Sequence, residues 1–152
     1  MKRLIFALSG AFATLAAAPA SALYEQARWF TLDNGMDVIV IENDRAPAVH
    51  ARVVYKVGAL DEQPGQYGIA HVLEHMMFRG SPEHRGRGLA PGEYDGALGR
   101  IGATDNASTS ANVTSYYGVM GSEHLELFLE LNAILMNGVD ADSDQLENEK
   151  GV

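Results

Sequence analysis

The spacing of apolar residues predicts β-structure in the first third of the mature chain. Residues 29–32 and 36–41 are apolar-rich runs separated by the turn sequence Asp-Asn-Gly at 33–35. Because Asn-Gly is a favoured tight turn between antiparallel strands, these runs are expected to form a β-hairpin. Residues 50–57 alternate in polarity and are rich in Val and Tyr, so they are predicted to form a third strand.

Helical spacing of apolar residues appears in three later segments. Residues 69–78 are predicted to form a helix, and its core side is expected to carry Ile69, Val72, Leu73 and Met76. Pro91 is expected to open a second helix that ends before Gly102. Ser122 is expected to cap a third helix. The inner face of that helix is predicted to carry Leu125, Leu127, Phe128, Leu131, Ile134 and Leu135.

The remaining segments read as a loop, two strands and a further helix. Residues 80–92 have the composition of a polar loop, and 104–120 read as two strands joined near 110–114. A last helix is expected from about Asp144. Because no helix stop precedes Val152, we expect the chain to be the N-terminal piece of a longer protein.

The first 22 residues have the composition of a secretory signal. Lys2 and Arg3 precede an uncharged apolar segment at 4–18, and a small-x-small cleavage site ends at Ala22. The mature domain, residues 23–152, is therefore expected in the bacterial periplasm or outside the cell. No membrane attachment is expected after cleavage.

Charge and cysteine content narrow the classes of partner and site. Removing residues 1–22 takes away two cations and no acid, so the formal net charge goes from −9 to −11. Such a surface repels nucleic acid and anionic membranes, so neither is expected as a partner. Since the chain has no Cys, any metal ion would be held by His, Asp or Glu.

The segment His71-Val-Leu-Glu74-His75 carries the most specific chemistry. On a helix that turns about 100° per residue, these three polar side chains lie within one arc of roughly 100°. Two imidazoles so placed can ligate one zinc ion beside a carboxylate, and this order of residues is the inverzincin signature. An ordinary polar helix face is the alternative, although apolar neighbours favour a buried helix. The other histidines lack ligand spacing and are expected at the surface: His50, His84 and His124.

The segment from His71 to Gly80 resembles the site helix of the pitrilysin/insulinase family of zinc metallopeptidases. A second motif supports the resemblance, and it consists of Gly102, Asn106-Ala107, Thr109-Ser110, Thr114 and Tyr116-Tyr117. The resemblance covers essentially residues 29–152. It implies an α+β domain, with an antiparallel-rich sheet and helices packed on one face. This would be the N-terminal metallopeptidase domain, incomplete at its C-terminus.

The resemblance also implies the roles of the motif residues. His71 and His75 would ligate zinc, and Glu74 would be the general base that acts on a metal-activated water. The third ligand is expected to be a Glu near position 156, beyond the chain. Glu149 then matches a helper Glu seven residues earlier that orients the ligands. The alternative is a third ligand within the chain, either Glu147 or Glu149.

A substrate-binding edge is implied by the second motif. An extended peptide would add as a strand to the edge formed by Asn106, Ala107, Ser108 and Thr109, with main-chain hydrogen bonds giving affinity. Tyr117 is expected to reach the site. An ordinary polar strand is the alternative. Ala103 stands where the family often has Gly, and Ser108 where it often has an aromatic residue, so both positions bear on substrate preference.

The resemblance therefore implies a zinc-dependent endopeptidase that cleaves extended peptides. Its expected partners are peptide substrates, the missing C-terminal half of the same protein and a homologous partner subunit. Because groups needed for catalysis would lie in the missing half, this chain alone is expected to be inactive and to bind zinc weakly. The alternative is a non-catalytic, peptide-binding subunit of the same family, which the complete set His71, Glu74 and His75 disfavours.

Overall fold

A computed structural model describes residues 26–84 and 86–139 of the chain. These residues form two compact units whose boundary in the sequence lies between Arg45 and Ala46. The predicted signal segment 1–22 lies outside the described residues. So do Glu147, Glu149 and the helix expected from Asp144.

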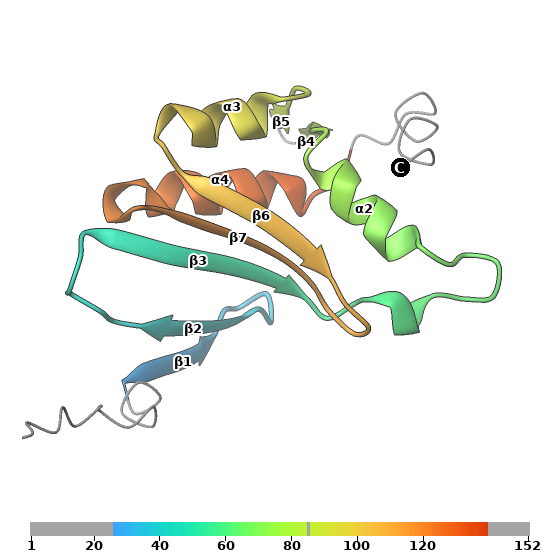
Figure 1. Ribbon diagram of the computed structural model, residues 1–152, viewed down its shortest axis with the longest axis horizontal. Coiled ribbons are helices and arrows are strands. Elements are labelled where there is room, and N and C mark those ends of the chain that lie inside the picture. The colour runs from blue at the N-terminus through green and yellow to red at the C-terminus, as the bar shows by residue number, and fades with distance from the viewer. Residues whose placement is uncertain (1–25, 85, 140–152) are drawn as a thin grey trace, which may run out of the picture. The chain divides into compact units, whose positions relative to one another are not determined.

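The first unit is the predicted β-hairpin (Figure 1). Strands β1 (Ala27–Thr31) and β2 (Asp37–Ile41) pair in antiparallel register from Ala27↔Ile41 to Thr31↔Asp37. The amide of Leu32 donates to the carbonyl of Met36 at 2.9 Å, which closes a loop of three residues. Gly35 adopts a φ of +85° in this loop. The hairpin is confirmed, with a glycine in the left-handed region that three-residue loops use.

The second unit is built on a three-stranded antiparallel sheet with the order β3-β7-β6. The strands are β3 (Ala48–Tyr55), β6 (Thr104–Thr109) and β7 (Thr114–Gly121). Side chains alternate across this sheet, so Tyr116 and Met120 are buried on one face while Val119 is exposed on the other. The two strands predicted over 104–120 are confirmed. The strand predicted at 50–57 begins two residues earlier.

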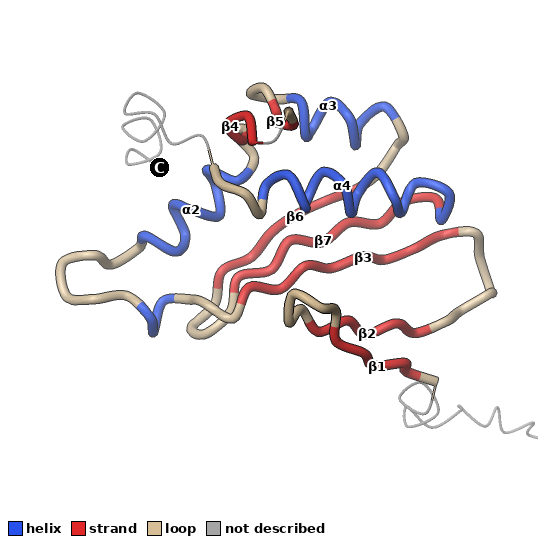
Figure 2. Tube along the Cα trace, turned by 180° about the vertical axis from the view of Figure 1, so that it is seen from behind, coloured by secondary structure: helices blue, strands red, loops and turns tan. Residues whose placement is uncertain are grey.

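Among the described residues, three helices accompany this sheet: α2 (Ile69–Met77), α3 (Glu93–Arg100) and α4 (Leu125–Leu135). All three contribute side chains to one core with the inner face of the sheet. Figure 2 shows α4 running alongside the strands. The core consists of Ala51, Met77, Leu89, Tyr94, Ala97, Leu98, Tyr116, Met120, Phe128, Leu131 and Leu135. The predicted α+β class, with an antiparallel-rich sheet and helices on one face, is confirmed. None of the described helices is long and apolar enough to cross a bilayer.

Two local expectations are wrong in whole or in part. The core side of α2 includes Met76 as predicted, but Ile69 and Leu73 are about half exposed, and the other buried residues are Ala70, Glu74 and Met77. Ser122 does not cap α4, because a 3-10 turn at Ser122–His124 precedes the helix and no side chain bonds to its N-cap.

The polar loop expected at 80–92 contains a small antiparallel pair. Its strands are β4 (Ser81–His84) and β5 (Arg87–Leu89). The pair is fixed to α4, since the Ser81 hydroxyl donates to the carbonyl of Ile134 at 3.3 Å and the Arg87 guanidinium pairs with Glu130 at 2.6 Å. These strands were missed because Pro and Gly interrupt them and give no apolar alternation.

The packing of α4 on the sheet depends on Gly118. A Cβ atom at this position would lie 2.9 Å from the ring of Phe128, which is completely buried. Only a residue without a side chain therefore allows α4 to pack this ring directly on β7. The packing of the core relies on this contact.

Gly118→Ala is expected to lower the free energy of unfolding by about 1–3 kcal/mol, because the added methyl group overpacks the core against Phe128. The matched control is Gly99→Ala in α3, where an added Cβ meets nothing within 4 Å. That substitution should stabilise the helix by about 0.5–1 kcal/mol. Thermal and chemical unfolding of both variants is the measurement. Equal effects of the two substitutions would contradict the packing account.

Alkaline pH should weaken the core through Tyr94. Burial raises the pKa of this phenol from 10.0 to about 12, so between these values the unfolded chain loses a proton that the folded chain keeps. Stability is therefore present below pH 10 and declines as pH rises toward 12. Tyr94→Phe should lose less stability over this range than the unmodified protein. The measurement is the melting temperature of each protein between pH 10 and pH 12. Tyr67→Phe is the control, because this side chain is 78% exposed.

Candidate metal centre

Helix α2 is held at its N-terminal end by contacts from outside the helix. The amides of Ala59 and Leu60 donate to the carbonyls of Ser110 and Ala111 at 3.1 and 2.7 Å, which ties the preceding segment to the β6–β7 turn. The carboxylate of Glu62 accepts from the amides of Gly68 at 2.8 Å and Ala70 at 2.9 Å. These amides are among those that a helix start leaves without partners. The start of α2 is thereby fixed relative to β6.

The three polar side chains of the motif leave α2 in two directions. The Nε2 atoms of His71 and His75 are 3.2 Å apart, and the two rings are nearly perpendicular with centroids 4.7 Å apart. His71 is exposed and His75 is half-buried, whereas Glu74 is only 8% exposed. The helix therefore exposes His71, leaves His75 half-buried and buries the carboxylate of Glu74.

The separation of the two imidazole nitrogens fits a shared metal ion. Two nitrogens at the zinc–nitrogen bond length and the tetrahedral angle are separated by roughly 3.3 Å. The observed 3.2 Å also suits a hydrogen bond from one imidazole to the other. No third His, Asp or Glu joins the pair within the part of the chain that the structure describes. Glu74 is not a third ligand in this arrangement because its carboxylate is directed at the sheet.

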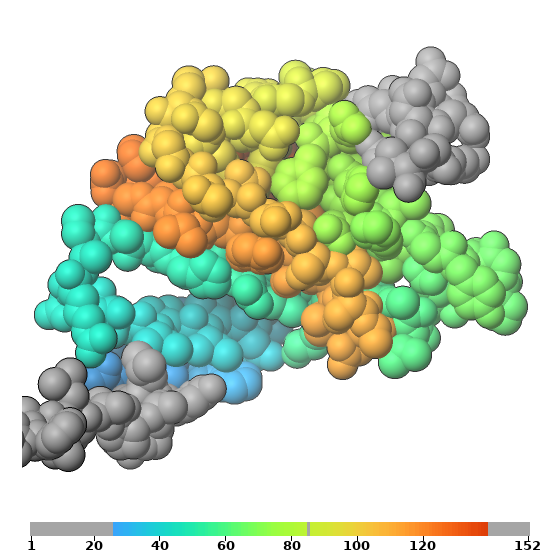
Figure 3. Space-filling view, in the orientation of Figure 1, coloured from blue at the N-terminus to red at the C-terminus, as the bar shows by residue number. Residues whose placement is uncertain are grey.

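Glu74 is hydrogen-bonded to the end of strand β6. The hydroxyl of Thr109 donates to Oε2 of Glu74. In the space-filling view, α2 and β6 lie side by side (Figure 3), in agreement with their direct contacts. A buried carboxylate needs such a partner, because removing it from water without one is costly. The bond therefore accounts for the acid on the inner face of α2.

A small cavity opens beside the carboxylate. It has a volume of about 380 Å³ and is lined by Glu74, His75, Phe78, Arg79, Asp95 and Asn106. Burial, followed by the negative charge of Glu74, raises the pKa of Tyr116, so this neighbouring phenol stays protonated at neutral pH. Burial and the charge of Asp95 raise the pKa of Asp105. The cavity thus combines an apolar ring with charged groups of both signs.

The predicted substrate-binding residues lie on β6, which is an edge strand of the described sheet. Ala107 pairs with the buried Tyr116 and Thr109 pairs with Thr114, so both of these β6 side chains share the inner face. Asn106 and Ser108 alternate with them along β6 and lie on the opposite face. Asn106 lines the cavity beside Glu74, and the Ser108 hydroxyl is 3.1 Å from that of Ser115.

Tyr117 is not brought to Glu74. It pairs with Asn106 in the ladder, so its side chain leaves the sheet on the face opposite Tyr116. Its ring lies 6.1 Å from His50 and 4.8 Å from the guanidinium carbon of Arg52. The alternation of the strand therefore separates Tyr117 from the motif residues.

Two residues that position the motif were not identified from the sequence. Thr109 was assigned to the substrate edge alone, although its hydroxyl is bonded to Glu74. Glu62 was not singled out, although it accepts both amide bonds at the start of α2. The sequence offers only a weak signal for Glu62, which is an acidic residue six positions before Gly68, the N-cap of α2.

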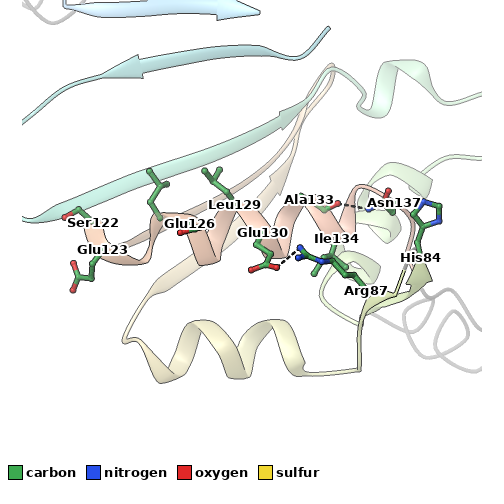
Figure 4. A pocket seen from close by; sticks show the side chains of 11 residues that line it. His84, Arg87, Ser122, Glu123, Glu126, Leu129, Glu130, Ala133, Ile134 and Asn137 are labelled. Atoms are coloured by element: carbon green, nitrogen blue, oxygen red, sulfur yellow. Dashed lines mark hydrogen bonds and ion pairs between the residues drawn. The ribbon is translucent and has the colours of Figure 1, made fainter. Parts of the chain in front are cut away.

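A second, larger hollow lies along the outer side of α4 (Figure 4). Its volume is about 1010 Å³, and it shares no lining residue with the cavity beside Glu74. Its lining includes the ion-paired Arg87 and Glu130, and half-exposed Leu129 is one of its apolar residues. No residue of the motif takes part in it.

Comparison with known proteins extends these observations. The model of the insulinase family, peptidase family M16, matches residues 38–152. A Helicobacter pylori protein named zinc protease PqqE is 34% identical over 123 residues, which make up 80% of this chain and 27% of that protein. The chain therefore spans little more than a quarter of this relative's length.

Solved structures agree with the sequence match. The crystal structure of a protease from Helicobacter pylori matches with a TM-score of 0.74 and 33% identity, covering 82% of this chain and 29% of that one. The crystal structure of pitrilysin matches with a TM-score of 0.72 and 27% identity, covering 82% of this chain and 13% of that one. Since the family model covers well over half of the sequence and the fold agrees, this chain belongs to the insulinase family of peptidases, family M16.

Proposed function

We propose that the protein is a zinc-dependent endopeptidase in which His71 and His75 hold the metal ion and Glu74 is the general base. The observation that carries this proposal is the 3.2 Å separation of the two Nε2 atoms beside a buried carboxylate. The name of the Helicobacter pylori relative, a zinc protease, supports the choice of metal and reaction. The third ligand is proposed to come from outside the described residues.

The reaction assigns a separate task to each side of α2. A zinc ion in the site would supply Lewis acidity, which polarises the scissile carbonyl and makes water a better nucleophile. Glu74 takes a proton from the attacking water and returns it to the leaving nitrogen of the peptide. The imidazoles do not need to transfer protons, and the carboxylate does not need to bind metal. The division of α2 into an imidazole side and a carboxylate side suits this mechanism.

The substrate is proposed to bind as an added strand along β6. This strand lies at the edge of the described sheet, next to α2, so its outer backbone groups are placed beside the motif. Main-chain hydrogen bonds to Asn106–Thr109 would give affinity for extended peptides with modest demands on their sequence. The groups that stabilise the oxyanion are proposed to come from the rest of the protein.

Glu74→Gln is expected to reduce kcat for a peptide substrate by about 100-fold or more, because an amide cannot accept the proton from water. Zinc content per chain should be unchanged, since the imidazoles are retained. The measurement is steady-state kinetics with metal analysis, on the longest form of the protein that its gene encodes. A non-catalytic, peptide-binding subunit would show no turnover before the substitution and unchanged peptide affinity after it.

His71→Ala and His75→Ala should each weaken zinc binding by more than about 100-fold, which exceeds the usual effect of losing a group that only supports a ligand. Competition with a chromogenic chelator measures the affinity directly. His50→Ala and His84→Ala are the controls, since both side chains are exposed and neither belongs to the pair. Equal zinc affinity of all four variants would rule out the proposed ligands.

A further inference from the structure

We propose that Thr109 is a positioning residue for the general base, and that its hydroxyl holds the Glu74 carboxylate in the orientation needed for proton transfer. This inference rests on the proposed function. It adds to the main-chain role of Thr109 at the substrate edge a side-chain role that acts through Glu74. The observation behind it is the hydrogen bond from the Thr109 hydroxyl to Oε2 of Glu74.

The Thr109 hydroxyl is the donor in its bond with Glu74, because an ionised carboxylate only accepts hydrogen bonds. Thr114 pairs with Thr109 in the ladder, and their hydroxyl oxygens are 3.4 Å apart. The hydroxyl of Thr114 donates to the carbonyl of Val57 at 3.1 Å. Each hydroxyl has one proton to donate. Thr114 therefore does not supply a proton to Glu74 or Thr109, and Thr109 donates to the carboxylate.

The Thr109 side chain is itself rigidly placed. It belongs to the last residue of β6, just before the β6–β7 turn, where the amide of Ser110 donates to the carbonyl of Val113 at 2.8 Å. A β-branched side chain on a strand has restricted χ1, so the direction of its hydroxyl follows from the backbone. The same turn is tied to the segment before α2 through Ser110 and Ala111. The Thr109 hydroxyl and the Glu74 carboxylate are thus both positioned by the backbone contacts of the β6–β7 turn.

The bond determines which carboxylate oxygen is free. Oε2 accepts from Thr109, and the structure records no donor to Oε1 among the described residues. Oε1 is therefore the oxygen left to accept a proton, and Glu74 lines the cavity where the peptide bond would lie. Without the hydroxyl, a buried carboxylate with several rotatable bonds would turn toward another donor. The neighbouring imidazoles, or a metal held by them, are the competing partners.

The test compares Thr109→Val, which keeps the shape of the side chain and removes its hydroxyl, with Thr109→Ser, which keeps the hydroxyl. Thr109→Val should lower kcat by about 10- to 100-fold, because a small misplacement of a catalytic group has effects of this size. KM and zinc content should not change. Thr109→Ser should restore most of the rate. Thr104→Val, an exposed position on the same strand, is the matched control.

A second measurement shows whether Thr109 acts through Glu74. In a Glu74→Gln background, Thr109→Val should cause no further loss of kcat. The same two substitutions should also be non-additive in equilibrium unfolding, which requires neither metal nor activity. This readout serves even if one variant has too little activity to measure. Thr109→Ala replaces Thr109→Val should the valine variant fail to fold.

The possible results separate this inference from the proposed function. If Glu74→Gln remained active, the proposed function would fail. If Glu74→Gln were inactive while Thr109→Val matched the unmodified kcat, only the role of Thr109 would be wrong. A higher KM with unchanged kcat would assign Thr109 to substrate binding instead. Additive effects on unfolding would show that the two side chains are not coupled, and would overturn the inference.

Discussion

The burial of a carboxylate against strand β6 is the constraint on which the rest of this site depends. Helix α2 has to bring Glu74 close to Thr109 while it keeps the rings of His71 and His75 outside. A buried acid is tolerated only with a hydrogen-bond donor, so Glu74, together with the buried Ala70, Met76 and Met77, sets the rotation of the helix about its axis. Once that rotation is set, helical spacing places both imidazoles on the same side. The contacts of Glu62 and of the β6–β7 turn fix the end of the helix in the same place.

Elements with a strong local signal could be predicted from the sequence, and those that depend on packing could not. The hairpin, the strands of 104–120 and the helix beginning at Ile69 have clear periodicity or turn residues, and all are present. The inner side of α2 was assigned correctly at Met76 but wrongly at Ile69 and Leu73, because their apolar side chains suggested a core face, whereas the buried side is the one that carries Glu74. Likewise β4 and β5 depend on bonds to α4, which lies about 40 residues later in the chain. Periodicity within a segment carries no information about such distant partners.

The same distinction applies to the candidate site, where the motif residues could be predicted and the groups that orient them could not. The spacing of His71, Glu74 and His75 predicted paired imidazoles and an acid nearby, and the structure has this arrangement. The hydroxyl of Thr109 was beyond prediction because its direction follows from strand alternation and from the distance between α2 and β6. Strand alternation also explains why the expectation for Tyr117 failed. This residue was expected near the motif, but it lies on the opposite face of the sheet. A sequence motif therefore identifies the chemistry more reliably than it identifies the groups that orient it.

The proposed metal site also links α2 to residues outside the described part of the chain. A catalytic zinc ion takes three protein ligands, and the described residues supply two nitrogens in suitable positions. Those nitrogens are 3.2 Å apart on one helix whose start is held by Glu62, so little conformational entropy is lost when this end of the site binds a metal ion. The free energy of metal binding would then act mainly on the segment that brings the third ligand. In such an arrangement α2 is a preformed half of the site, and zinc affinity reports on how well the other half is held in place.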